Sequence, residues 1–346
     1  MKMLRMMAAT TALATALVPL ALSAQDLTEV RMINPLPRST NFFPLVVGEA
    51  LGYFEEEGVK VDLLPSDTSI PYVAFLQNGQ ADLAMLDPFE TINALDAGAE
   101  INTVFEVMQN APEGIGVPAG SSVQSMADLV GTTVGLVSDR DRAFLQAAMA
   151  AEGLSIDDVK TVVLGEAGPT LAAAMRDGNV SAIAGAAPDW IVLIANGIDT
   201  RLITPQSLLA SPANTFSMAV SEIEAKREAV TGFLRAWCKG MHVATVNRDA
   251  VAQMLRQTVP EEWEIEAAGQ LYLDMSIGMN VSVTEQCGQP QADVWTAIQP
   301  RMVESGGIAA ARDVATFLND SFIAAINDFD RSEVEAEAAA WFEANK

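Results

Sequence analysis

The chain carries one pattern of glycines, apolar runs and prolines twice, and this repeat limits the possible folds more than any other feature. The first copy spans residues 52–88 and the second spans residues 151–190. Each copy fits a helix ended by Gly, an apolar strand, a helix ended by Asn78-Gly79 or Asp177-Gly178, a second strand, and a loop with proline. The repeat predicts two similar α/β lobes, and such lobes commonly bind a ligand between them.

Length and composition favour a globular protein of two domains and exclude several classes of function. The chain has 346 residues, of which 50% are hydrophobic and 19% are charged, so it is long enough for two cores and is not of a disordered type. The formal net charge of −25 argues against nucleic-acid binding, because such proteins normally need a basic surface. The same charge would repel an anionic membrane surface.

The first residues have the pattern of a targeting segment. Lys2 and Arg5 form a basic head, an apolar stretch follows, and Ser23-Ala24 offers small residues for cleavage. We therefore predict a signal peptide over residues 1–24, with cleavage one residue earlier as the alternative. No later apolar stretch is long enough to span a bilayer, so the expected product is a soluble periplasmic protein. The competing interpretation is an uncleaved membrane anchor.

The sequence contains two cysteines, Cys238 and Cys287. An even number in an exported protein permits one disulfide bond. The alternative is two buried free thiols, because the sequence does not give the distance between the two residues.

The spacing of apolar residues predicts alternating strands and helices in both lobes, and hence parallel-rich sheets covered on both faces. In the first lobe the predicted strands are 30–33, 59–64, 81–86 and 101–108, and the predicted helices are 42–53, 71–77 and 88–98. In the second lobe a short helix 126–129, a strand 133–137 and a helix 143–151 precede the second copy of the repeat, which ends near residue 203.

The remaining sequence predicts a return strand and a helical C-terminal part. Residues 216–220 fit the strand, and the helical period then continues to an Ala/Glu-rich tail at 333–346. Breaks are expected at Pro260, Gly278, Pro290 and Gly306-Gly307. The chain is thus expected to cross between the lobes twice, first at Gly114–Pro118 and then near residue 216. Lobe 1 would take residues 25–115 and 216–346, and lobe 2 would take residues 116–215.

Three segments of the chain resemble a known family. They are Gly52–Val61, Asn78–Ala84 and Met126–Gly131. They are similar to segments of the periplasmic solute-binding proteins of ABC importers for nitrate, alkanesulfonates, taurine and thiamine-pyrimidine precursors, and the likeness runs through about residues 28–305. The resemblance implies a type II periplasmic binding protein fold, which captures a small solute between two lobes by hinge closure and delivers it to a permease in the inner membrane. One departure is the loop 138–142, which is far more charged than the Ser/Gly-rich loop usual in the family.

Loops at the carboxyl ends of the predicted strands are the candidate binding elements, because ligands of open α/β sheets bind there. Ser, Thr, Asn and Asp also begin helices as caps, so capping alone is the competing interpretation for any single one of them. The predicted ligand-binding residues are Ser39, Thr40, Asn41, Thr68, Ser69, Asp87, Phe89, Ser138, Asp139, Arg140, Asp189 and Trp190.

The side chains in these loops point to two classes of solute. Arg140 could bind a sulfonate-like anion through two hydrogen bonds, while Arg142 fits a solvated pair balanced by neighbouring aspartates. The three predicted aspartates instead favour an amine or an aminopyrimidine, and we place this class first. Phe89 and Trp190 could stack on such a ring or cation, and packing in a hinge or core is the alternative for Phe89.

An enzyme is the alternative class of function. His242 is the only histidine and lies within a predicted helix. The sequence shows no zinc-ligand spacing, nucleophile elbow or P-loop, and it lacks the histidine and cysteine cluster of the related pyrimidine-synthesis enzymes. We therefore predict a monomeric binding protein without catalytic residues, metal or cofactor. A solute receptor for a TRAP-type importer, or a ligand-sensing partner of a membrane kinase, would have similar lobes.

Overall fold

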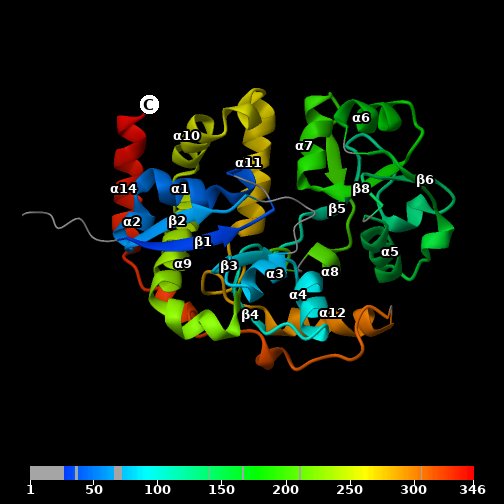
Figure 1. The fold of residues 1–346 in the computed structure, drawn as a ribbon. Coiled ribbons are helices and arrows are strands. Elements are labelled where there is room, and N and C mark those ends of the chain that lie inside the picture. The colour runs from blue at the N-terminus through cyan, green and yellow to red at the C-terminus, as the bar shows by residue number, and fades with distance from the viewer. Residues whose placement is uncertain are drawn as a thin grey trace, which may run out of the picture.

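The chain forms two α/β lobes that lie side by side (Figure 1). The computed structural model describes residues 27–35, 38–65, 72–139, 141–165, 167–209, 212–304 and 306–346. The predicted signal peptide over residues 1–24 lies outside the described residues.

The first lobe contains a five-stranded sheet in the order β2-β1-β3-β10-β4. β1 runs parallel to β2 and β3, whereas β10 runs antiparallel to β3 and β4. β10 is the predicted return strand, and it fills the sheet between β3 and β4 after the chain has built the second lobe. The strands are β1 (Thr28–Ile33), β2 (Val59–Leu63), β3 (Leu83–Leu86), β4 (Ile101–Glu106) and β10 (Thr215–Ala219).

The second lobe repeats this arrangement with a sheet in the order β7-β6-β8-β5-β9. β6 is parallel to β7 and β8, and β5 is antiparallel to β8 and β9. The two copies of the sequence repeat therefore occupy equivalent places in the two sheets, as the repeat predicts. The strands are β5 (Glu113–Pro118), β6 (Thr133–Leu136), β7 (Lys160–Val163), β8 (Ala182–Ala186) and β9 (Thr200–Leu202).

Helices connect the strands in the expected alternation. In the first lobe they are η1 (Thr40–Phe42), α1 (Phe43–Leu51), α2 (Tyr53–Glu56), α3 (Tyr72–Gln77) and α4 (Pro88–Asp96). In the second lobe they are η2 (Met126–Leu129), α5 (Asp141–Ala151), η3 (Ile156–Asp158), α6 (Gly168–Arg176), α7 (Ala187–Ala195) and α8 (Gln206–Leu209). The predicted helix 42–53 is divided because Gly52, at φ 76°, adopts the left-handed conformation that ends α1.

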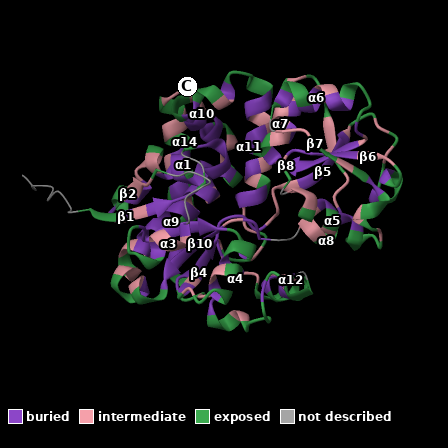
Figure 2. Cartoon of the chain, turned by 45° about the vertical axis from the view of Figure 1, so that its right-hand side comes forward, coloured by how far each residue is buried: buried purple, intermediate pink, exposed green. Residues whose placement is uncertain are grey.

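The C-terminal part is helical, as predicted, and most of it packs on the first lobe. Its long helix α9 places Phe233 and Trp237 against Phe216 of β10, with ring centroids 5.6 and 5.1 Å apart. The helices are η4 (Val220–Glu222), α9 (Ile223–Val246), α10 (Arg248–Thr258), η5 (Pro260–Trp263), α11 (Glu266–Asn280), α12 (Ala292–Glu304), η6 (Val314–Thr316), α13 (Ile323–Ile326) and α14 (Arg331–Ala344). Figure 2 shows the buried residues concentrated in the sheets and on the helix faces that cover them.

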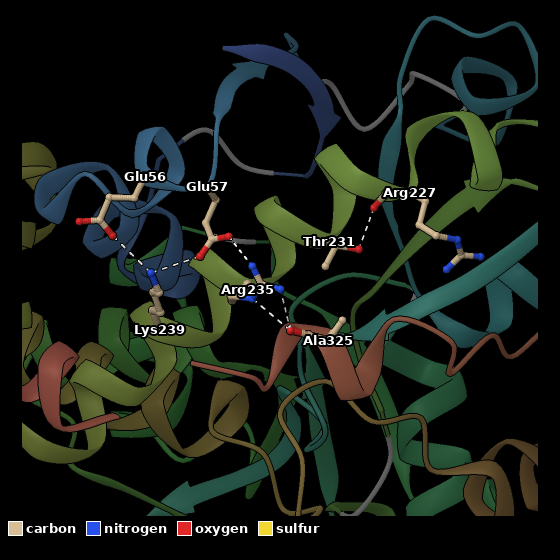
Figure 3. Close-up of polar contacts among 7 residues, drawn as sticks. All are labelled: Glu56, Glu57, Arg227, Thr231, Arg235, Lys239 and Ala325. Atoms are coloured by element: carbon tan, nitrogen blue, oxygen red, sulfur yellow. Dashed lines mark hydrogen bonds and ion pairs between the residues drawn. The ribbon is translucent and has the colours of Figure 1, made fainter. Parts of the chain in front are cut away.

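Polar contacts and a disulfide also attach α9 to its surroundings. Arg235 donates to Glu57 at 2.5 Å and to the carbonyl oxygen of Ala325 at 3.0 Å, and Lys239 lies 3.2 Å from the same glutamate (Figure 3). Cys238 of α9 is joined by a disulfide to Cys287, which precedes α12. The N-terminal α2, the central α9 and the C-terminal helices are therefore held together by charge and by covalent linkage.

Two predictions of local structure were wrong. The segment Gly114–Pro118 was expected to be a crossing between the lobes, but it lies within strand β5 and pairs with β8 and β9. Gly278 was expected to break the helical pattern, but α11 continues through it to Asn280 because one glycine costs a helix only about 1 kcal/mol.

Candidate functional site

The carboxyl ends of the parallel strands form one edge of each sheet. In the first lobe Asn34 follows β1 and Asp87 follows β3, and these strands are direct neighbours. In the second lobe Ser138 lies just beyond β6, and Ala186 ends the neighbouring β8. Glu113 belongs to the same edge, because it begins the antiparallel strand β5 opposite Ala186.

Three carboxylates from these edges influence one another across the lobes. Burial raises the pKa of Glu113, and the negative charges of Asp87 and Asp141 raise it further. Asp87 belongs to the first lobe, Asp141 belongs to the second, and Glu113 begins the first strand after the crossover. The carboxyl ends of the two sheets therefore face a common region that carries negative charge from both sides.

Asp87 begins α4 as its cap and also faces this region. Its Oδ1 accepts a hydrogen bond from the backbone N–H of Glu90 at 2.7 Å. Burial raises the pKa of Asp87 and that of Glu90, although both residues are exposed to solvent. Asp87 and Glu90 are therefore open to water yet partly desolvated by their surroundings. We take the region around Asp87 and Glu113 at the strand ends as the candidate solute site.

The charged loop after β6 is internally paired. Ser138 donates to Asp141 Oδ2 from its backbone N–H at 2.6 Å and from its hydroxyl at 3.1 Å. Asp139 forms an ion pair of 2.9 Å with Arg142, whose guanidinium also donates to Thr161. The predicted residues Arg140, Thr68 and Ser69 lie outside the described residues.

The predicted residues after β1 are buried and are used in part by the C-terminal helices. Ser39 donates to Glu262 Oε1 at 2.8 Å, and the backbone N–H of Thr40 donates to Oε2 of the same carboxylate at 2.7 Å. The Thr40 hydroxyl accepts from Trp263 Nε1 at 3.3 Å. These contacts fix η1 against η5. The side-chain oxygen of Asn41, in contrast, is buried without a hydrogen-bond partner in the described part of the chain.

The remaining predicted residues differ in what they present to the site. Asp189 caps α7 and accepts from the backbone N–H of Ala186 at 2.7 Å. Phe89 is 51% exposed beside Asp87, so its ring is available to a solute. Trp190 is 2% exposed and covers Gly116, where an added Cβ would lie 2.6 Å from the ring. In this structure its ring offers no face to a solute.

Three site residues were missed from the sequence. Glu113, which directly precedes the predicted crossing, was not considered, and Asp141 was treated only as a charge that balances Arg142. Asn34 was not singled out, yet both polar atoms of its fully buried amide lack a hydrogen-bond partner within the described segments. Its position directly after β1 was the available signal, because strand ends are where such sheets bind ligands.

A separate hollow of about 300 Å³ lies between α2, α9 and α14, with Glu56, Glu57, Lys239, Glu333 and Glu337 among its lining residues. The first two of these glutamates precede β2, so the hollow lies near the opposite edge of the first sheet. Several of its charges already pair with one another (Figure 3). It is therefore distinct from the region at the carboxyl ends.

The described residues contain no group of three or more His, Cys, Asp or Glu side chains that could hold a metal ion. Within the same segments, no helix has both the length and the apolar character needed to cross a membrane.

The comparison with known protein families identifies the chain. A family model described as NMT1/THI5 like matches residues 39–250, which is more than half of the sequence. The chain belongs to this family. The resemblance seen in the sequence is thereby confirmed.

Individual relatives are distant. The riboflavin-binding protein RibY of Chloroflexus aurantiacus is 24% identical over 290 residues, which cover 82% of this chain and 82% of RibY. The 4-amino-5-hydroxymethyl-2-methylpyrimidine phosphate synthase of Legionella pneumophila is 23% identical over 221 residues, which cover 63% of this chain and 70% of the synthase.

A solved structure supports the fold. The periplasmic aliphatic sulphonate binding protein SsuA from Escherichia coli matches with a TM-score of 0.65 at 18% identity, over 84% of this chain and 97% of SsuA. The predicted fold is thus confirmed: it is the two-lobed fold of periplasmic binding proteins, with two crossovers and a helical C-terminal part.

Proposed function

We propose that this member of the NMT1/THI5-like family is the soluble periplasmic solute-binding component of an ABC importer. It binds a small organic solute between its lobes and delivers that solute to a permease in the inner membrane. The observation that carries the proposal is that Asp87, Glu113 and Asp141 meet at the carboxyl ends of the two sheets, because charged groups of both lobes are thereby brought near one another. The similarity of the fold to SsuA supports this assignment.

The two crossovers provide a hinge for this function. The first follows β4 and the second precedes β10, and the two run side by side. Backbone N–H groups of Val107 and Met108 donate to Asn214 O at 2.8 and 3.0 Å, and Ala213 donates to Met108 O at 2.9 Å. We infer that the lobes rotate about these paired segments. A solute that contacts both lobes favours the closed form, since it makes more contacts there than in the open form.

The charge of the site supports an amine or an aminopyrimidine as the solute. A cationic or donor-rich group would relieve the repulsion among the carboxylates, whereas a sulfonate would add a further negative charge to them. We propose that Asp87 and Asp189, with Phe89 and the Ser39–Asn41 segment, take part in binding. Arg140 stays a predicted contact for an anion, and the sulfonate-like class is therefore kept in the test.

We propose further that the protein is not an enzyme. His242 lies on α9, where its Nε2 is 3.2 Å from a carboxylate oxygen of Glu335 in α14. Both cysteines are joined in the disulfide. The histidine and the cysteines therefore do not supply a nucleophile or a base to the region at the strand ends.

Titration calorimetry on the mature chain tests the proposal. The solutes are amines, aminopyrimidines, riboflavin and alkanesulfonates, and each bound solute is recovered and analysed by chromatography. The expected result is saturable binding of one class, with the solute returned unchanged. Chemical conversion of the solute would contradict the proposal and favour an enzyme. Absence of binding throughout the panel would contradict the importer function as proposed here.

A further inference from the structure

The disulfide between Cys238 and Cys287 borders a small hollow in the surface. The hollow has a volume of about 150 Å³ and lies between the C-terminal half of α9 and the segment 281–287 that follows α11. Both cysteines line it, together with His242 and Thr245, which lie one and two turns beyond Cys238 on the same helix. The disulfide is thus reached from the surface of the folded chain.

The two cysteines differ in how far they are buried. Cys238 is only 2% exposed on the inner face of α9, whereas Cys287 is partly exposed in the connection between α11 and α12. A disulfide is opened when a thiolate attacks one of its two sulfur atoms, so access to that atom decides the reaction. Cys287 is therefore the residue that a thiol entering the hollow can attack, and Cys238 is the leaving group.

The residue after Cys287 lies against the end of the strand from which the chain leaves the first lobe. Gly288 packs on Phe105 of β4 so closely that an added Cβ would lie 2.0 Å from the ring. The carbonyl oxygen of Gly288 accepts a hydrogen bond from the backbone N–H of Glu106 at 2.9 Å. The buried carboxylate of Glu106 in turn accepts from the backbone N–H of Gln291 at 2.8 Å. The residues beside the disulfide thus hold the start of the first crossover.

The same segment surrounds a residue within the crossover. Gln109 is fully buried, and its Oε1 accepts from the backbone N–H groups of Val283 and Thr284 at 2.8 and 3.1 Å. Its Nε2 donates to the carbonyl oxygen of Gln289 at 2.8 Å. The disulfide is the single covalent cross-link between the segment 281–291 and α9, since the chain has two cysteines. Without it, the segment depends on contacts that open and close locally.

We propose that this disulfide is a site of thiol–disulfide exchange with a dithiol reductant, and that its reduction loosens the first crossover. A thiolate of the reductant attacks Cys287 Sγ, the bond between the two cysteines breaks, and Cys238 leaves with the electron pair and takes up a proton. The second thiol of the reductant then attacks the reductant's own sulfur in the mixed disulfide and releases Cys287, which is protonated. The dithiol is oxidised to a disulfide, and the protein disulfide is reduced by two electrons.

The exchange step is independent of the importer function, whereas its effect on lobe movement rests on the hinge proposed above. Dithiothreitol is the probe, and alkylation followed by mass measurement counts the reduced cysteines. The rate of reduction should be proportional to the dithiothreitol concentration and nearly constant in urea below the unfolding transition, because no global opening is needed. A rate that rises steeply with urea would show that only the unfolded chain reacts, and would overturn the proposal.

A matched pair of variants tests the route of access. Thr245 and Val246 are both exposed at the end of α9, but only Thr245 is among the residues that line the hollow. Thr245→Trp places a large ring in the hollow and should slow reduction by about 10-fold, since access limits the reaction. Val246→Trp should leave the rate unchanged. Equal rates in the two variants would contradict attack through the hollow.

Hydrogen exchange on the solute-free protein tests the effect on the crossover. Reduction should speed exchange of the amides in segments 281–291 and 106–110 by about 10-fold, while the amides of β6 and β8 in the second lobe keep their rates. Unchanged exchange in both segments, or faster exchange throughout the chain, would refute the link between the disulfide and the hinge. Because no solute takes part, each of these results leaves the importer function to be decided by calorimetry.

Discussion

Replacing Asp87 by Asn removes one charge from the proposed site while keeping the local structure. Asp87 caps α4 through the 2.7 Å bond from the N–H of Glu90, and Asn is as effective a cap as Asp. The helix should therefore form as before, and the free energy of unfolding should change by less than about 0.5 kcal/mol. The small change that occurs should be stabilising, because repulsion with Glu113 is reduced.

The effect on binding should be much larger. A hydrogen bond to a charged group is worth about 1.5–3 kcal/mol, so Asp87→Asn should weaken binding of an amine or aminopyrimidine by about 10- to 150-fold. The difference from wild type should shrink in high salt, because the carboxylate is open to solvent. Titration calorimetry at low and high ionic strength measures both effects.

Asp96→Asn is the matched control for this experiment, since Asp96 lies at the other end of the same helix and contacts the N–H of Ala309 at 3.3 Å. It should leave affinity unchanged. Two results would refute the reasoning. One is an Asp87→Asn protein that binds a proven amine solute as tightly as wild type does. The other is a loss of affinity accompanied by an equal loss in the control.

Three further predictions concern pH, packing and the disulfide. Burial and neighbouring charge raise the pKa of Glu113, so the stability linked to this group is present at low pH and is lost as pH rises through the raised pKa. The melting temperature of wild type relative to Glu113→Gln should therefore fall as pH rises. A difference that stays constant with pH would contradict this. Gly240→Ala should lower the free energy of unfolding in urea by about 1–3 kcal/mol, since the new Cβ would lie 2.6 Å from Pro44 O. An unchanged free energy of unfolding would show that α9 can move away from α1 at no cost. Replacing Cys238 and Cys287 by Ser should cost about 2–4 kcal/mol, because the disulfide closes a separation of 49 residues, while solute affinity should persist if the bond is purely structural.

The architecture could be predicted from the sequence because its signals are local and repeated. Gly79 and Gly178 each adopt positive φ at the end of a helix, and a buried strand follows each of them. The two copies of the repeat therefore predicted the same order of helix and strand in both lobes. The return strand β10 could also be placed. The strand β5 could not be predicted, because its glycines at 114 and 116 resemble those of a linker. In the structure, Gly116 instead leaves room for the ring of Trp190.

The site was harder to predict because it combines distant segments. Loops after strands can be located from the order of elements, and this placed Asp87, Ser138 and Asp189 at the expected edge. Glu113 was missed because it begins β5, the strand that could not be predicted from the sequence.

Native mass spectrometry of the mature chain, purified gently from a periplasmic extract, tests the central claim most directly. The predicted result is a bound small molecule that carries an amino or ring N–H group, is released intact on denaturation, and is retained less by Asp87→Asn. A bound nitrate or sulfonate, or a molecule chemically altered by the protein, would contradict the claim.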